Sequence, residues 1–90
     1  MHKSQEQLRQ ALDQAAEQVV VGGIYQHYKN PDQTYLVTGL EIMEVDDRVG
    51  VSYQAQYGEQ IPYIRPLESW LEMVDTAAGL VPRFAHIAEQ

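Results

Sequence analysis

Residues 48–57 read RVGVSYQAQY, and they have the most regular alternation of apolar and polar side chains in the chain. Successive side chains of a strand point to opposite faces of a sheet, so a period of two is typical of a strand with one buried and one wet face. The stretch therefore predicts a strand of an antiparallel sheet. Its buried face would carry Val49, Val51, Tyr53, Ala55 and Tyr57.

The segments around this stretch also have the composition of strands separated by turns. Gly39 lies inside one of them and predicts a bend or bulge, because glycine in a strand often marks one. Pro66 predicts a short helical turn that ends at Trp70. The expected strands are residues 23–29, 34–45, 48–57, 61–65 and 71–75. The expected turns, rich in residues that tolerate turn geometry, are Asn30-Pro31-Asp32, Asp46-Asp47, Gly58-Glu59 and Ala78-Gly79.

Residues 5–20 have the period of an amphipathic helix instead. Ser4 and Gln7 form the S-x-x-Q pattern of a capping box at its start, and the glycine pair Gly22-Gly23 supplies a stop. Either the helix docks on its own domain or it pairs with a second copy of the chain, because its apolar stripe is poor in large side chains. The stripe contains Leu8, Ala11, Leu12, Ala15, Ala16, Val19 and Val20.

Together these patterns predict an α+β protein. The N-terminal amphipathic helix is followed by a small antiparallel, SH3-like β-barrel or a strongly curved sheet. The expected organisation is a helical extension over residues 1–21 and a small β-barrel domain over residues 22–87. Ninety residues suffice for one modest core.

Composition narrows the classes of function. The chain has no cysteine, which excludes disulfides, thiolate metal sites and cysteine nucleophiles, and favours a cytoplasmic location. We expect no membrane association, because no apolar run approaches the roughly 20 residues that span a bilayer. The formal net charge of −7 opposes attraction to nucleic acid phosphates, so nucleic acid is not the expected partner.

Four clusters rich in tyrosine, glycine, arginine and proline stand out: GIYQHYK at 23–29, VSYQAQYG at 51–58, YIRPLESW at 63–70 and VPRF at 81–84. Their joint occurrence resembles the bacterial family known as domain of unknown function number 1653, and the resemblance covers residues 22–87. Tyr63 stands where many members have tryptophan. The resemblance implies a fold and a bacterial origin. It implies no catalytic residue, because the family has no established activity.

Motifs of known chemistry are not found. His2, His27 and His86 lack the spacing of metal ligands, so we predict neither a metal nor a cofactor. Ser52 and Ser69 lack a nucleophile elbow, and the glycine pair precedes a strand rather than the helix of a phosphate loop. Carboxylates are frequent in a chain this acidic and indicate a solvated surface.

One constellation combines aromatic rings with arginine, and it would suit a groove for a short peptide, a nucleotide or an anionic metabolite. Arg65 is the preferred functional residue, because the rigid Arg-Pro step fixes the direction of its side chain. The alternative is structural, with the rings in the core and with Arg65 and Arg83 paired to Glu68 and Glu72. The candidate ligand-binding residues are Tyr25, His27, Tyr53, Gln54, Tyr57, Arg65, Trp70 and Arg83.

The sequence therefore favours a non-catalytic binding or adaptor module. One alternative is a single-stranded RNA or nucleotide binder, and another is a small enzyme that acts on an anionic substrate through His27 and Arg65. The expected partner is a protein, a peptide or a small anionic ligand, and the N-terminal helix could form a homodimer.

Overall fold

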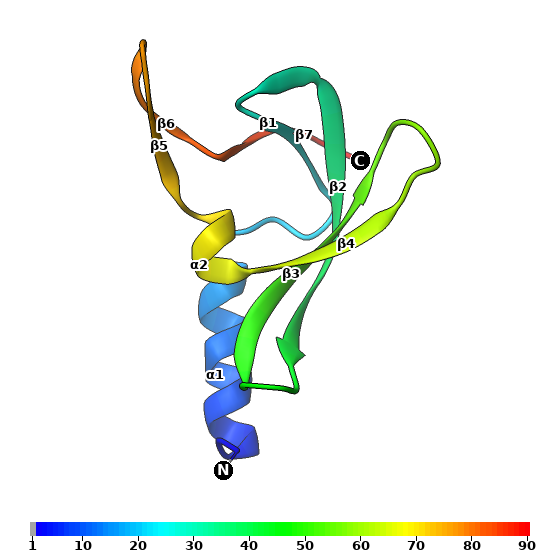
Figure 1. Ribbon diagram of the computed structural model, residues 1–90. Helices are drawn as coiled ribbons and strands as arrows, with labels where there is room; N and C mark the ends of the chain where they lie inside the picture. The colour runs from blue at the N-terminus through cyan, green and yellow to red at the C-terminus, as the bar shows by residue number, and fades with distance from the viewer. Residues whose placement is uncertain (1) are drawn as a thin grey trace.

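An open antiparallel sheet with the strand order β4-β3-β2-β1-β7 forms the centre of the protein (Figure 1). The computed structural model describes residues 2–90. The sheet strands are β1 (Gly23–His27), β2 (Asn30–Met43), β3 (Arg48–Ala55), β4 (Pro62–Pro66) and β7 (Phe84–Glu89). The remaining elements are helix α1 (Gln5–Ala16), the single turn of helix α2 (Leu67–Trp70), and the separate hairpin of β5 (Met73–Thr76) and β6 (Gly79–Pro82).

The predicted α+β class is confirmed, whereas the closed barrel is not. Within residues 2–90 the sheet keeps two edges, β4 and β7. These edges nevertheless approach each other, because the guanidinium of Arg65 on β4 lies 5.2 Å from the ring centroid of Phe84 on β7. The sheet is therefore strongly curved and open.

The alternation that predicted a strand at residues 48–57 is confirmed along β3. Val49, Val51, Tyr53 and Ala55 are buried, as expected. Tyr57 lies beyond the end of the strand, with 36% of its surface exposed. The predicted bulge in β2 is also confirmed, because the register with β3 shifts between Val37 and Gly39.

Aromatic rings dominate the core on the inner face of the curved sheet. The rings of Trp70 and Phe84 stack at 3.9 Å with an interplanar angle of 3°. Tyr25 meets Trp70 edge-on at 5.2 Å, and Tyr53 packs against it at 4.9 Å. Helix α2 therefore serves to insert Trp70, which is only 2% exposed, between three strands of the sheet.

Helix α1 begins where the capping box predicts and ends earlier than expected. Ser4 accepts from the Gln7 amide at 3.1 Å and the Gln7 side chain accepts from the Ser4 amide, but the helix stops at Ala16 rather than near residue 20. The run Val19-Val20-Val21 is β-branched and favours helix weakly. Leaving the helix at this point lets Val19 enter the core and lets the Val20 amide donate to the Tyr25 hydroxyl at 3.0 Å.

The turn predicted at Asn30-Pro31-Asp32 is wrong. The chain turns at residues 28–29, and Asn30 already pairs with His27. Because Gln26 pairs with Thr34, residues 31–33 bulge out of the β1–β2 ladder. Pro31 has no amide to donate, so it is tolerated in such a bulge. Strands β6 and β7 were not predicted, since Pro82 and Arg83 interrupt the alternation there.

Strand β4 begins with Pro62 and ends with Pro66. The Ala55 amide donates to the Ile61 carbonyl at 3.1 Å. In an antiparallel ladder, the backbone groups of successive residues point alternately towards and away from the neighbouring strand. Because Ile61 faces β3, the backbone groups of Pro62, Ile64 and Pro66 point away from it. Of these three outward positions, only Ile64 has an amide hydrogen.

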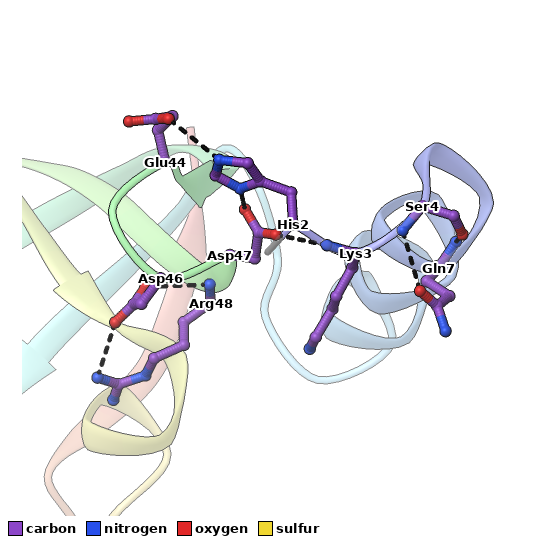
Figure 2. Close-up of polar contacts among 8 residues, drawn as sticks. All are labelled: His2, Lys3, Ser4, Gln7, Glu44, Asp46, Asp47 and Arg48. Carbon is purple, nitrogen blue, oxygen red and sulfur yellow. Dashed lines mark hydrogen bonds and ion pairs between the residues drawn. The ribbon is translucent and has the colours of Figure 1, made fainter.

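The N-terminal segment is fastened in cis to the turn between β2 and β3 (Figure 2). Asp47, 6% exposed, accepts from the Lys3 amide at 2.7 Å and bonds His2 Nδ1 at the same distance. His2 Nε2 lies 3.5 Å from Glu44. Asp47 has a positive φ of 58°, which Asp tolerates better than most residues. Its carboxylate therefore joins the start of α1 to the hairpin.

We predict that Asp47→Asn lowers the thermal stability and removes part of its dependence on acid. The hydrogen bonds from His2 and Lys3 hold the pKa of Asp47 below its usual 3.8. The stabilisation is therefore fully present above pH 4 and is lost as the pH falls through the depressed pKa. Asn keeps the tolerance for positive φ but loses the charge. The check is the melting temperature from pH 2 to 7, with Asp75→Asn on the exposed face of β5 as control. Equal acid dependence in wild type and Asp47→Asn would contradict the prediction.

We also predict that Trp70→Ala costs about 3–5 kcal/mol of unfolding free energy, as is typical for deleting a buried aromatic ring. This is a large share of the stability of a domain of this size. Urea unfolding provides the measurement. Leu80→Ala, at a side chain that is 69% exposed, is the control and should change stability by less than about 0.5 kcal/mol. A similar loss in both variants would show that the ring stack is not the centre of the core.

Candidate functional site

A cleft of about 280 Å³ lies over the inner face of the sheet, and all five strands of the sheet contribute to it. The curvature that brings β4 towards β7 creates its walls. The lining residues are His27, Asn30, Gln33, Tyr35, Tyr53, Tyr57, Tyr63, Arg65 and Phe84.

Strand alternation and register explain why these side chains meet. Tyr63 and Arg65 are two residues apart on β4, so they share a face. Tyr63 lies opposite Tyr53 of β3, and His27 lies opposite Phe84 of β7. Opposite residues in an antiparallel ladder project to the same side of the sheet. Asn30, which pairs with His27, and Gln33, in the bulge at residues 31–33, complete the lining.

Arg65 is the cation of the cleft. Its Nη1 donates to the Ser69 hydroxyl at 2.9 Å, and its guanidinium lies over the Phe84 ring. Among the described residues no carboxylate forms an ion pair with Arg65. The structural alternative in which Arg65 pairs with Glu68 is therefore wrong, because Glu68 pairs with Arg48.

The other three arginines of the chain are all paired with carboxylates: Arg9 with Asp13, Arg48 with Asp46 and Glu68, and Arg83 with Glu72. The chain contains 13 acidic residues, but none of the nine residues that line the cleft is acidic. The cleft is thus a locally positive site on an acidic protein.

His27 presents a defined tautomer. The Lys29 amide donates to His27 Nδ1 at 3.2 Å, so the proton of the neutral ring is on Nε2. Burial lowers the pKa of His27 below its ordinary 6.5, and the positive charges of Arg83, Arg65 and Lys29 lower it further. Near neutral pH the ring is therefore uncharged and acts as a hydrogen-bond donor through Nε2.

The hydroxyls of Tyr35 and Tyr57 lie 2.8 Å apart. Burial, followed by the hydrogen bond with Tyr57, raises the pKa of Tyr35 above its ordinary value. Only one of the two hydroxyl hydrogens is needed for the bond between them. The other is available to an acceptor in the cleft.

Four of the eight predicted ligand-binding residues line the cleft: His27, Tyr53, Tyr57 and Arg65. Tyr25 and Trp70 belong to the core instead. The Gln54 amide donates to the Gln60 carbonyl at 3.0 Å and lies on the opposite face of the sheet. Arg83 pairs with Glu72 at 2.8 Å, as the structural alternative predicted. It does not line the cleft, but its positive charge lowers the pKa of His27, which does.

Sequence reasoning missed the remaining lining residues: Asn30, Gln33, Tyr35, Tyr63 and Phe84. Tyr63 had a usable signal, because a residue two positions before Arg65 on a strand shares its face. Tyr35 and Phe84 had none, since their place depends on the pairing of β2 with β1 and of β7 with β1.

Larger hollows lie elsewhere, one of them of about 300 Å³ on the opposite face of the sheet beside Gln54. Another of about 390 Å³ separates the start of α1 from the β2–β3 turn, and one of about 350 Å³ lies beside the β5–β6 hairpin. None of these hollows contains an arginine. Across residues 2–90, no group of three or more His, Cys, Asp or Glu side chains is placed to hold a metal ion. In the same residues, neither helix is long and apolar enough to cross a membrane.

Known proteins give a match at the level of family and fold. A comparison with curated proteins gives no match. A solved crystal structure of a DUF1653 protein from Bordetella bronchiseptica is similar, with 37% sequence identity and a TM-score of 0.69. The similarity covers 81% of this chain and 94% of that one. Residues 23–86 match the family described as protein of unknown function (DUF1653), and the chain belongs to that family.

Proposed function

We propose that this domain is a non-catalytic binding module whose cleft takes a small anionic ligand. The observation that carries the proposal is the electrostatic environment of Arg65. Arg65 is the one arginine without a carboxylate partner among the described residues, and it lines a cleft that no acidic residue enters.

The donors around Arg65 suit an anion. A guanidinium binds carboxylate or phosphate through parallel hydrogen bonds, and such charge-assisted bonds are roughly twice as strong as neutral ones. Ser69 and Phe84 restrict the guanidinium before any ligand arrives, so less side-chain entropy is lost on binding. His27 Nε2 and one tyrosine hydroxyl add neutral donors. The cleft is just smaller than the roughly 300–1,000 Å³ of typical ligand pockets, which favours a compact ligand.

The tautomer of His27 supports binding rather than catalysis. A general base needs an unprotonated nitrogen that faces the substrate. The free nitrogen of His27 is Nδ1, and the Lys29 amide already occupies it. An enzyme that uses His27 as its base is therefore the weaker proposal.

We predict that Arg65→Gln weakens the binding of phosphate or sulfate at least tenfold, because charged hydrogen bonds contribute about 1.5–3 kcal/mol. Amide chemical-shift titration at two salt concentrations measures the affinity. Arg9→Gln, on the exposed surface of α1, is the matched control and should bind like wild type. Equal affinity in Arg65→Gln and wild type, or shifts that avoid the cleft, would overturn the proposal.

We predict that sulfate binds more tightly as the pH falls from 8 to 5.5. An anion beside His27 raises its depressed pKa, so binding takes up a proton on Nδ1, which releases the Lys29 amide, and affinity increases as the pH falls through the pKa of the complex. Sulfate itself does not titrate in this range. Calorimetric titrations at several pH values measure the effect, and His27→Gln should remove it while keeping a donor. A pH dependence that persists in His27→Gln would assign the effect to another group.

A further inference from the structure

We propose that the ligand of this cleft is a compact aromatic oxyanion: a planar ring that stacks on Tyr63 and carries, through a short linker, a phosphate or carboxylate that binds Arg65. This proposal rests on the proposed function, and it adds the class of ligand.

The first argument is a row of contacting aromatic rings that ends at the surface. The row runs from Phe84 and Trp70, 3.9 Å apart, through Tyr53 at 4.9 Å from Trp70, to Tyr63 at 5.6 Å from Tyr53. The last pair is stacked, with an interplanar angle of 28°. Tyr53 covers one side of the Tyr63 ring, yet Tyr63 remains 46% exposed. The row therefore ends in an accessible aromatic ring on which another planar ring can pack.

The second argument is the distance between this face and the cation. Tyr63 and Arg65 are neighbours on one face of β4, and two residues of a strand span about 6.6 Å. A ligand that uses both must separate its ring from its anionic group by a few bonds. A nucleoside monophosphate has this layout with phosphate, and an arylalkyl acid has it with carboxylate.

The third argument limits the ligand to a single unit. Asp32 lies in the bulge between the lining residues Asn30 and Gln33, and Glu59 lies two residues after Tyr57. Both carboxylates are exposed. Successive phosphates of a polymer would have to pass these charges at the margins of the cleft, on a protein with a net charge of −7. One anionic group on Arg65 avoids them.

Two ligand series test the ring at constant charge. The first compares ribose 5-phosphate with uridine 5′-monophosphate, and the second compares cyclohexylacetate with phenylacetate. We expect the ring-bearing member of the matching series to bind roughly tenfold or more tightly, since stacking a base on an aromatic side chain contributes about 1–3 kcal/mol. The series in which the gain occurs identifies the phosphate or the carboxylate as the anionic group.

Variants at Tyr63 separate the contact with the ligand's ring from the contact with its anionic group. Tyr63→Leu should remove the difference in affinity between the ring-bearing and ring-free members of the series, whereas Tyr63→Phe should keep that difference. Ile64→Leu, the next residue on β4 and on its opposite face, is the matched control. Retention of the native amide spectrum shows that each variant folds.

The outcomes distinguish this proposal from the proposed function. If ring-free anions bind and rings add nothing in either series, the aromatic ligand is wrong and the anion cleft stands. If no anion of either series binds, both are overturned. Tighter binding of a single-stranded oligonucleotide than of uridine 5′-monophosphate would overturn the single-unit ligand.

Discussion

The stacking of Trp70 on Phe84 is the contact on which the rest of the structure depends. Trp70 follows β4 directly, through α2, and Phe84 begins β7, so the stack joins the two opposite edges of the sheet. The sheet curls around these rings, and its inner face becomes both core and cleft. Phe84 contributes to both, because it stacks on Trp70 and also lies under Arg65. Core packing and the position of the cation are therefore set by the same side chain.

Local patterns predicted the elements whose own residues determine them. The period of β3 follows from the alternation of residues 48–55, and the start of α1 follows from Ser4 and Gln7. The end of α1 could not be predicted, because it depends on a place for Val19 in a core built by distant strands. Strand β7 was missed for a related reason: its pairing with β1 defines it, and its own sequence carries only a weak signal.

Four of the nine residues that line the cleft were predicted, and the division has a physical cause. The residue types were well chosen, but aromatic rings suit a core and a groove equally well. The strand register and the position of α2 decide between these places: Tyr25 and Trp70 lie in the core, Tyr57 lines the cleft, and Tyr53 belongs to both. The fact that best defines the site, the lack of a carboxylate partner for Arg65 among residues 2–90, depends on where the carboxylates lie in space. Glu68 is three residues away in sequence, yet it pairs with Arg48.

The two prolines of β4 have a consequence for the behaviour of the protein at high concentration. An unprotected sheet edge offers amides and carbonyls to any other strand, and such edges promote aggregation. Because Pro62 and Pro66 occupy two of the three outward positions, β4 cannot form a regular ladder with a strand from another molecule. The exposed rings and apolar side chains near this edge thus remain accessible to a small ligand without becoming a seed for intermolecular sheet growth.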